Sequence, residues 1–219
     1  MGMKGQIFLI IAILFTLFLV VLRNGLNITE ILESQKTLEE NLDRLEFENI
    51  RSEFPDGSIV SFNNTVNMTN NTINFTRYVQ LVEQSKGLTF NAFSVQTAYP
   101  NLTASVASDM NATVFNLLGE QILFLNLTNA DQSGSQSFTT TNVPDNTTVS
   151  SPFTINIGSD TNFTFYVFWN TSTRNSTDSF LIPAQISGSK YVGYFDITLI
   201  GKRSTHRDKF VETDTITKP

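Results

Sequence analysis

The sequence predicts a mainly β (α+β) protein, in which an N-terminal membrane helix and an amphipathic helix precede an antiparallel β-sandwich ectodomain. Three observations lead to this prediction. Residues 7–22 are apolar apart from one Thr, residues 29–54 show apolar side chains at helical spacing without Pro or Gly, and most later segments alternate with a period of two. With 219 residues, the chain has room for one domain beyond the helices.

The apolar run from Ile7 to Leu22 predicts the membrane helix. At 1.5 Å per residue its length is about 24 Å, which is short for a hydrocarbon layer of roughly 30 Å. Lys4 precedes the run and Arg23 follows it. The run ends without the small-residue site of a secretory signal peptide, so we expect the segment to be retained.

The residues before this run, M-G-M-K-G-Q, are typical of a short basic leader. The arrangement resembles the class III signal peptide of archaeal type IV pilin-like proteins. The resemblance implies that a pilin-type signal peptidase cuts after Gly5, that Lys4 and Gly5 end the leader, and that Gln6 starts the mature chain. Ile10 stands where many family members carry an acidic residue. The alternative is an uncleaved signal anchor.

A second helix is expected above the membrane. Asn24-Gly25 is expected to interrupt the first helix, and Pro55-Asp56-Gly57 to end the second. Between them, side chains recur every three or four residues in a coiled-coil-like stripe. The stripe consists of Ile28, Ile31, Gln35, Leu38, Leu42, Leu45 and Asn49. It packs either on the chain's own domain or against copies of itself in a filament.

Glycosylation sequons dominate the rest of the chain. Of the 22 Asn residues, twelve stand in Asn-x-Ser/Thr, where about five would occur by chance. This density predicts an extracellular surface modified by an oligosaccharyltransferase, with everything after Leu22 outside the cell. Because no Cys accompanies the sequons, we interpret the chain as an archaeal surface protein. The sequons are at Asn27, Asn63, Asn67, Asn70, Asn74, Asn101, Asn111, Asn126, Asn146, Asn162, Asn170 and Asn175.

One short helix is predicted over 74–86, with Gly87 as its C-cap, and strands follow it. In residues 162–170, four apolar side chains including Trp169 share one face, and the sequon residues Asn162 and Asn170 share the other. Residues 117–120 suggest a hairpin, and residues 129–145 an exposed loop. The predicted strands cover 58–62, 88–96, 121–128, 136–141, 152–157, 162–170, 179–186, 191–199 and 209–216.

Composition excludes several classes of function. A net charge of −6 argues against a general nucleic-acid binder. The absence of Cys excludes disulfides, Cys-ligated metals and thiol catalysis. The single His, His206, is interpreted as an exposed bystander in a polar turn. The sequence contains no metalloprotease, P-loop or dinucleotide motif, and carboxylates such as Glu120 show no evident pairing. We therefore expect no enzyme, no catalytic residue, no metal and no cofactor.

The expected organisation is a leader over 1–5 (if processed), a transmembrane or pilin-type helix over 6–23, an amphipathic stalk over 24–57, a β-sandwich ectodomain over 58–200 and a strand or tail over 201–219. The preferred function is a structural one: a glycosylated pilin-like filament subunit that self-associates through its N-terminal helices. The alternative is a single-pass, membrane-anchored module that binds a surface layer, a glycan or a filament-stator partner. A secreted hydrolase is the weakest reading. The expected location is the cell membrane or an extracellular filament.

Overall fold

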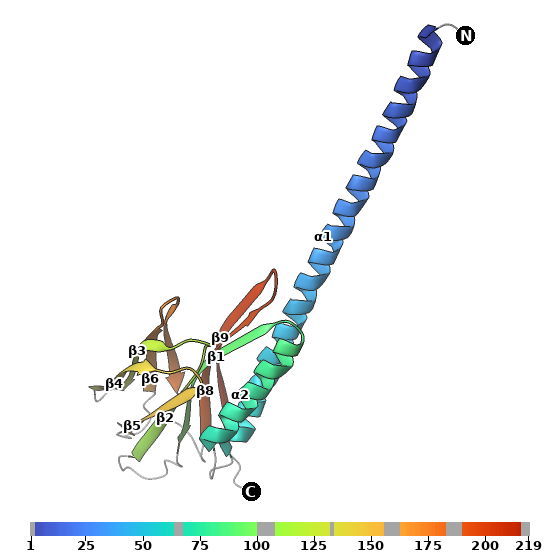
Figure 1. The fold of residues 1–219 in the computed structure, drawn as a ribbon. Helices are drawn as coiled ribbons and strands as arrows, with labels where there is room; N and C mark the ends of the chain where they lie inside the picture. The colour runs from blue at the N-terminus through green and yellow to red at the C-terminus, as the bar shows by residue number, and fades with distance from the viewer. Residues whose placement is uncertain are drawn as a thin grey trace. The chain divides into compact units, whose positions relative to one another are not determined.

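A computed structural model describes residues 3–63, 68–99, 108–131, 134–155, 163–182 and 190–215 (Figure 1). The chain divides into two compact units, Met1–Leu45 and Glu46–Pro219. Helix α1, Met3–Asn63, contributes to both units. The expected long apolar helix and the expected antiparallel, β-rich domain are both present.

Helix α1 is longer and more continuous than the sequence suggests. It passes through Gly25 and Pro55, where the chain was expected to break, and it includes residues 58–62, which were predicted as a strand. One Gly costs a helix only about 1 kcal/mol, and Leu22, Arg23 and Leu26 beside it are good helix formers. At Pro55, tertiary packing outweighs the cost of a proline inside a helix, because the neighbouring Phe54 and Ser58 are both buried. Those two predicted breaks and that strand are therefore wrong.

Helix α2, Met68–Ser85, begins six residues before its predicted start and ends one residue before its predicted end. Gly87 has a φ of +80°, and its N–H donates to the carbonyl of Gln84 at 3.0 Å. The N–H of Leu88 donates to the carbonyl of Glu83, also at 3.0 Å. This pair of bonds is the Schellman motif, which requires a left-handed residue at the position of Gly87. The predicted C-cap is confirmed.

Nine strands follow in the described part of the chain, and every neighbouring pair is antiparallel. One sheet has the order β5-β2-β1-β8-β9 and the other β4-β3-β6-β7. The predicted strands after residue 87 overlap observed ones, whereas no predicted strand corresponds to β2. The bounds are β1 Thr89–Tyr99, β2 Ser108–Leu117, β3 Ile122–Asp131, β4 Gly134–Val143, β5 Thr147–Ile155, β6 Phe163–Asn170, β7 Asn175–Ile182, β8 Lys190–Ile200 and β9 Thr205–Thr215.

Two connections differ from expectation. β2 and β3 belong to different sheets, so residues 117–120 cross between sheets and are not a hairpin. Residues 129–145, expected as a loop, contain β4, which forms a hairpin with β3 at the pair Asp131 and Gly134. A strand over 136–141 was also predicted, and β4 confirms it, although its inward side offers only Phe138 and Val143 as hydrophobic side chains. The C-terminal segment is an edge strand, β9, which was one of its expected forms.

Unit 2 contains two buried clusters. The first joins side chains of both sheets, and within it the rings of Phe93 on β1 and Trp169 on β6 lie 5.4 Å apart. The second joins α1 and α2 to the opposite face of the five-stranded sheet. In this cluster Phe54 on α1 contacts Phe195 on β8. Figure 1 shows α2 and the lower part of α1 beside β1 and β8. Because β8 lies between these clusters, its two faces are both buried. The predicted inward face of β6 is confirmed by the burial of Phe165, Val167 and Trp169.

Candidate functional site

The first candidate site is the apolar part of α1. The large apolar side chains between Ile11 and Leu22 are 46–68 % exposed, and α1 contains an 18-residue window of mean hydropathy 2.0. Thr16, the polar residue of the run, donates its hydroxyl hydrogen to the carbonyl of Ala12 at 2.8 Å. This bond satisfies the hydroxyl within the helix, so the whole circumference can face an apolar medium. Among the described residues, α1 is the one helix long and apolar enough to cross a membrane.

The residues of the expected processing site lie at the start of this helix. Lys4, Gly5 and Gln6 have helical backbone within α1. Their side chains lie outside the described part of the structure. The junction therefore lies on the same continuous helix as the apolar run.

The predicted stripe forms a second candidate surface, on the part of α1 that belongs to unit 1. Its hydrophobic members there are 55–60 % exposed. The α1 side chains buried in unit 2 are instead Phe47, Ile50 and Phe54. At 100° per residue, those three residues point roughly 140° away from the stripe. The α1 residues buried within unit 2 are therefore not members of the stripe, whose hydrophobic residues in unit 1 are Ile28, Ile31, Leu38, Leu42 and Leu45.

The described sequons are accessible. None of the sequon Asn side chains that the structure describes is buried. Those on α1, α2, β2 and β7 are exposed, namely Asn27, Asn70, Asn74, Asn111 and Asn175; those on β3, the β4–β5 turn and β6 are half-buried, namely Asn126, Asn146 and Asn170. The side chains of Asn63, Asn67, Asn101 and Asn162 lie outside the described residues.

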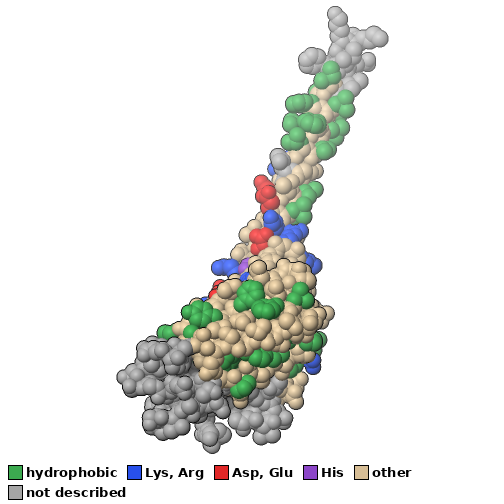
Figure 2. All heavy atoms as spheres, turned by 90° about the vertical axis from the view of Figure 1, so that its left-hand side faces the viewer, with side chains coloured by type: hydrophobic (Ala, Val, Ile, Leu, Met, Phe, Trp, Pro, Cys, Tyr) green, Lys and Arg blue, Asp and Glu red, His purple; other side chains and the backbone are tan. Residues whose placement is uncertain are grey.

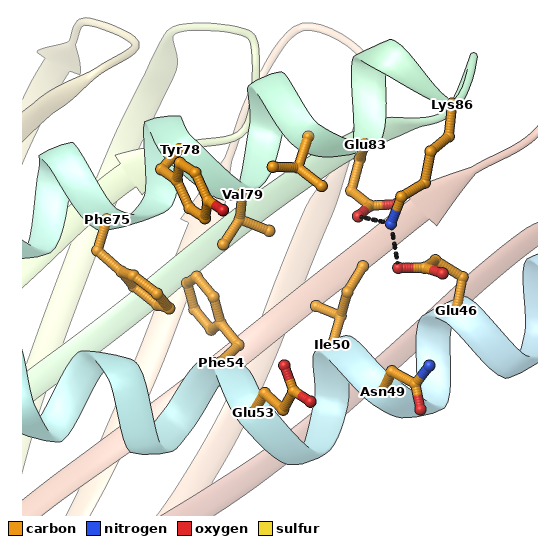
Figure 3. Close-up of a pocket in the computed structure, with 11 residues that line it drawn as sticks. Glu46, Asn49, Ile50, Glu53, Phe54, Phe75, Tyr78, Val79, Glu83 and Lys86 are labelled. Atoms are coloured by element: carbon orange, nitrogen blue, oxygen red, sulfur yellow. Dashed lines mark hydrogen bonds and ion pairs between the residues drawn. The ribbon is translucent and has the colours of Figure 1, made fainter.

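A cavity of about 230 Å³ lies between α1 and α2 (Figure 3). Phe54, Phe75 and Val79 form part of its apolar wall. At one end Lys86, just after α2, donates to Glu83 at 2.9 Å and also bonds Glu46 on α1. Burial and the neighbouring Glu46 carboxylate raise the pKa of Glu83, against the opposing effect of Lys86. This ion cluster fastens the two helices together.

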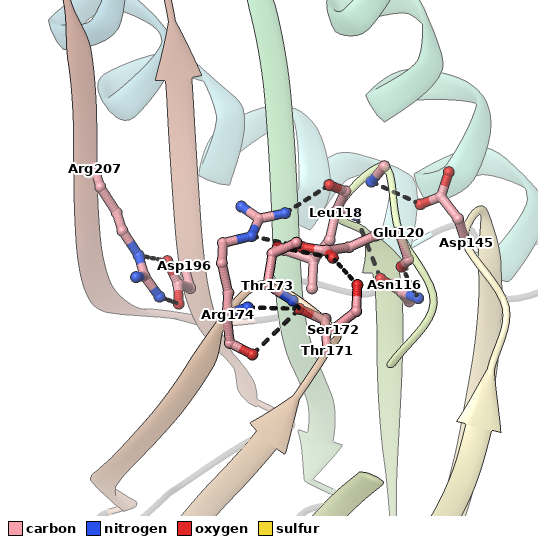
Figure 4. A network of polar contacts seen from close by, with 11 residues as sticks. Asn116, Leu118, Glu120, Asp145, Thr171, Ser172, Thr173, Arg174, Asp196 and Arg207 are labelled. Carbon is pink, nitrogen blue, oxygen red and sulfur yellow. Dashed lines mark hydrogen bonds and ion pairs between the residues drawn. The ribbon is translucent and has the colours of Figure 1, made fainter. Parts of the chain in front are cut away.

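A polar network joins three connections at one end of the sheets (Figure 4). Arg174, in the β6–β7 turn, donates to Glu120 at 2.7 Å and to the carbonyl of Leu118 at 2.8 Å. Asn116 donates to three carbonyls, two of which belong to Val143 and Pro144. Burial acts to raise the pKa of Glu120, but hydrogen bonds from Arg174 and Thr173 outweigh it and lower the pKa.

A second set of charges joins the two sheets where β7 and β9 form their edges. Lys209 on β9 and Tyr194 on β8 both donate to Asp178 on β7, at 2.5 and 2.8 Å. Burial acts to raise the pKa of Asp178, and these hydrogen bonds outweigh it, so the pKa is lowered. Arg207 pairs with Asp196 and lies over the Trp169 ring at 6.0 Å. Each of these charged side chains pairs with a partner inside the fold, so the contacts serve to hold the two sheets together.

His206 differs from its predicted setting. It lies in strand β9 and not in a turn, it is half-buried, and its ring stacks on Phe47 with centroids 5.7 Å apart. Within the described part of the chain, no group of three His, Cys, Asp or Glu side chains is arranged to hold a metal ion. The structure therefore places His206 in a packing contact between α1 and β9.

Comparison with known proteins adds no further assignment. No protein family, characterised protein or solved structure matches this chain.

Proposed function

We propose that this chain is a structural cell-surface protein, a glycosylated pilin-like filament subunit cleaved after Gly5. The observation that carries the proposal is the exposed, apolar circumference of α1 between Ile11 and Leu22. A helix that is apolar all round is stable only in lipid or against other apolar helices. In the proposed cycle the helix first spans the membrane and then packs against the same helix of other copies.

The stripe on α1 supports self-association. Its residues are exposed in unit 1, whereas α1 uses a different face to pack within unit 2. Repeats of three and four residues bring two such stripes together in coiled-coil fashion. Gln35 within the stripe would set the register of neighbouring copies, as a single polar residue does in coiled coils.

The sequons and the sheet domain support the cell-surface part of the proposal. The two sheets would form a sandwich head that carries N-linked glycans added by an oligosaccharyltransferase. The accessibility of the eight sequon Asn side chains that the structure describes is compatible with this modification. The ion pairs of unit 2 are engaged inside the fold, which favours a structural role over a catalytic one.

A cell-fractionation experiment tests the proposal. Cells producing the wild-type chain are expected to release it into the sheared extracellular fraction. Gly5→Leu replaces the residue after which the pilin-type peptidase is proposed to cut, so the variant is expected to stay in the membrane fraction. Gly25→Ala is the matched control, since it also replaces a Gly of α1 and is expected to behave as wild type. Equal release of the Gly5→Leu variant would contradict processing-dependent assembly.

The second candidate is an anchored, unprocessed module that binds a partner at the surface. The observation that favours it is an uncharged outer face on the four-stranded sheet, where Tyr166 is 49 % exposed. On this alternative, the wild type and Gly5→Leu would both remain in the membrane fraction. The same fractionation therefore separates the two functions.

A further inference from the structure

The outer face of the four-stranded sheet carries no charged side chain among its described positions. Burial of Leu125, Leu127 and Trp169 shows which positions point inward. The outward positions are the even-numbered residues of 124–130 and 164–170 and the odd-numbered residues of 135–141 and 175–181. They are Ser, Thr, Asn, aromatic or aliphatic residues throughout. Figure 2 looks onto the side of Figure 1 where β3, β4 and β6 lie, and hydrophobic side chains stand there in uncharged surroundings.

Two aromatic rings and two sequon residues form a square on this face. Phe124 on β3 lies directly opposite Asn170 on β6, and Asn126 on β3 lies directly opposite Phe168 on β6. The two rings occupy one diagonal and meet edge to face, with centroids 5.7 Å apart. Directly opposite residues in an antiparallel pair have Cβ atoms about 5 Å apart, so each Asn is next to a ring.

The amide of Asn126 is held in a defined orientation. Its nitrogen donates to the hydroxyl of Thr139 on β4 at 2.9 Å, and its oxygen accepts from the hydroxyl of Thr128 at 2.9 Å. N-glycosylation joins the amide nitrogen to the anomeric carbon of a lipid-phosphate-linked oligosaccharide; the bond from that carbon to the phosphate oxygen breaks, and the nitrogen loses one proton. The second amide hydrogen stays, so the bond to Thr139 can persist.

We propose that the Phe124–Phe168 ring pair is a binding platform for the first sugars of the N-linked glycans on Asn126 and Asn170. The inference rests on the N-glycosylation included in the proposed function and assigns a docking place to the sugars. A pyranose ring presents an apolar face of C–H groups, which packs on an aromatic face, and its hydroxyls find partners among Ser and Thr side chains. Neutral sugars suit a face that offers rings and hydroxyls without charge.

Covalent attachment singles out the glycan as the occupant. A sugar linked to either Asn is held beside the rings, so docking requires little further loss of translational freedom. A second protein copy would have to displace both glycans before it reached the same rings. The platform would thereby cover exposed apolar surface on the sheet and stiffen the first sugars of both glycans.

Mass spectrometry of glycopeptides and thermal unfolding together test the platform. The full chain is isolated from its natural host, occupancy of Asn126 and Asn170 is measured, and unfolding is followed by the fluorescence of Trp169. Removing both sites with Asn126→Gln and Asn170→Gln is expected to lower the Tm by about 3 °C. In a Phe124→Leu, Phe168→Leu background, the same removal is expected to leave the Tm unchanged within about 1 °C.

Asn111→Gln is the matched control, because Asn111 is a sequon residue that stands opposite Pro152 and not opposite a ring. Its effect on the Tm is expected to be the same in both backgrounds. If the double Leu variant does not fold, proton NMR of the wild type gives the answer. Ring-current upfield shifts are expected for the first sugar on Asn126 or Asn170 and not for the one on Asn111.

The outcomes separate the platform from the glycosylation itself. Equal Tm losses in both backgrounds, or first sugars without ring-current shifts, would overturn the platform and leave glycosylation intact. Sugars at other sequons but at neither Asn126 nor Asn170 would overturn the platform alone. A chain without sugar at any sequon would overturn both the platform and the glycosylated surface of the proposed function.

Discussion

Glu120 and Arg174 form an ion pair between residues 54 positions apart in the sequence. The pair joins the β2–β3 connection to the β6–β7 turn, and two hydroxyl side chains of that turn also bond Glu120. Nothing in the local sequence around either residue indicates this partner. Glu120 meets Arg174 because β2 and β3 belong to different sheets, so the connection between them passes from one sheet to the other. A single sequence does not reveal this passage between sheets.

Replacing Glu120 tests the role of this network. Glu120→Gln is expected to lower the free energy of unfolding by about 2 kcal/mol at pH 7, because the hydrogen bonds to a half-buried carboxylate lose their charge assistance. The pKa of Glu120 is lowered in the folded state, so its stabilisation is present above the unfolded pKa of about 4.3 and is lost as pH falls through the folded value. Urea unfolding followed by Trp169 fluorescence at pH 7 and pH 3 measures both values.

We expect Glu120→Gln to lower the free energy of unfolding clearly at pH 7 and by a smaller amount at pH 3. Glu48→Gln serves as the control, since Glu48 is exposed on α1 and its replacement should change stability by less than about 0.5 kcal/mol. A cost for Glu120→Gln that is equal at both pH values would show that ionisation of Glu120 does not support the fold.

At the scale of elements, the sequence predicts regular local patterns well and long-range choices poorly. The alternation in β6 correctly identifies its buried face, and Gly87 correctly marks the end of α2. The continuation of α1 through Pro55 depends on packing against the five-stranded sheet. The residues around Pro55 do not predict this packing. The predicted strand 136–141 lies within β4, but the full length of β4 does not follow from a hydrophobicity pattern, because pairing with β3 and not burial defines it.

Helix α1 offers a test of its two faces within one element. Phe54→Ala is expected to lower the free energy of unfolding of the sheet domain by about 3–5 kcal/mol, since the ring is 2 % exposed and contacts Phe90 and Phe195. Leu38→Ala truncates an exposed stripe residue and should change that free energy by less than about 0.5 kcal/mol. Urea unfolding monitored by Trp169 fluorescence compares the two variants.

The stripe variant should instead act on assembly. We expect Leu38→Ala to reduce the amount of chain recovered in the sheared filament fraction while leaving the unfolding midpoint unchanged. If Leu38→Ala destabilises the domain as much as Phe54→Ala does, the stripe would be part of the chain's own core, and its role in self-association would be contradicted.

At the scale of the whole molecule, the chain combines two units with different requirements. The described residues of the sheet domain bury many aromatic side chains in two clusters, and ion pairs link its two sheets. In the N-terminal unit, the described large apolar side chains between Ile11 and Leu45 are exposed, and the proposed function assigns lipid or other copies as their cover. The long apolar helix is evident from sequence, because residues 7–22 are apolar apart from Thr16, and such a run is long enough to be a candidate membrane span.

The N-terminus of the chain, isolated from its natural surface fraction, tests the proposed processing most directly. Mass spectrometry of the N-terminal peptide is expected to find a chain that starts at Gln6, which would place cleavage between Gly5 and Gln6. A chain that starts at Met1 or Gly2 would contradict processing by a pilin-type peptidase and favour the anchored binding module. A start beyond Leu22 would contradict both functions, because the apolar helix would then be removed.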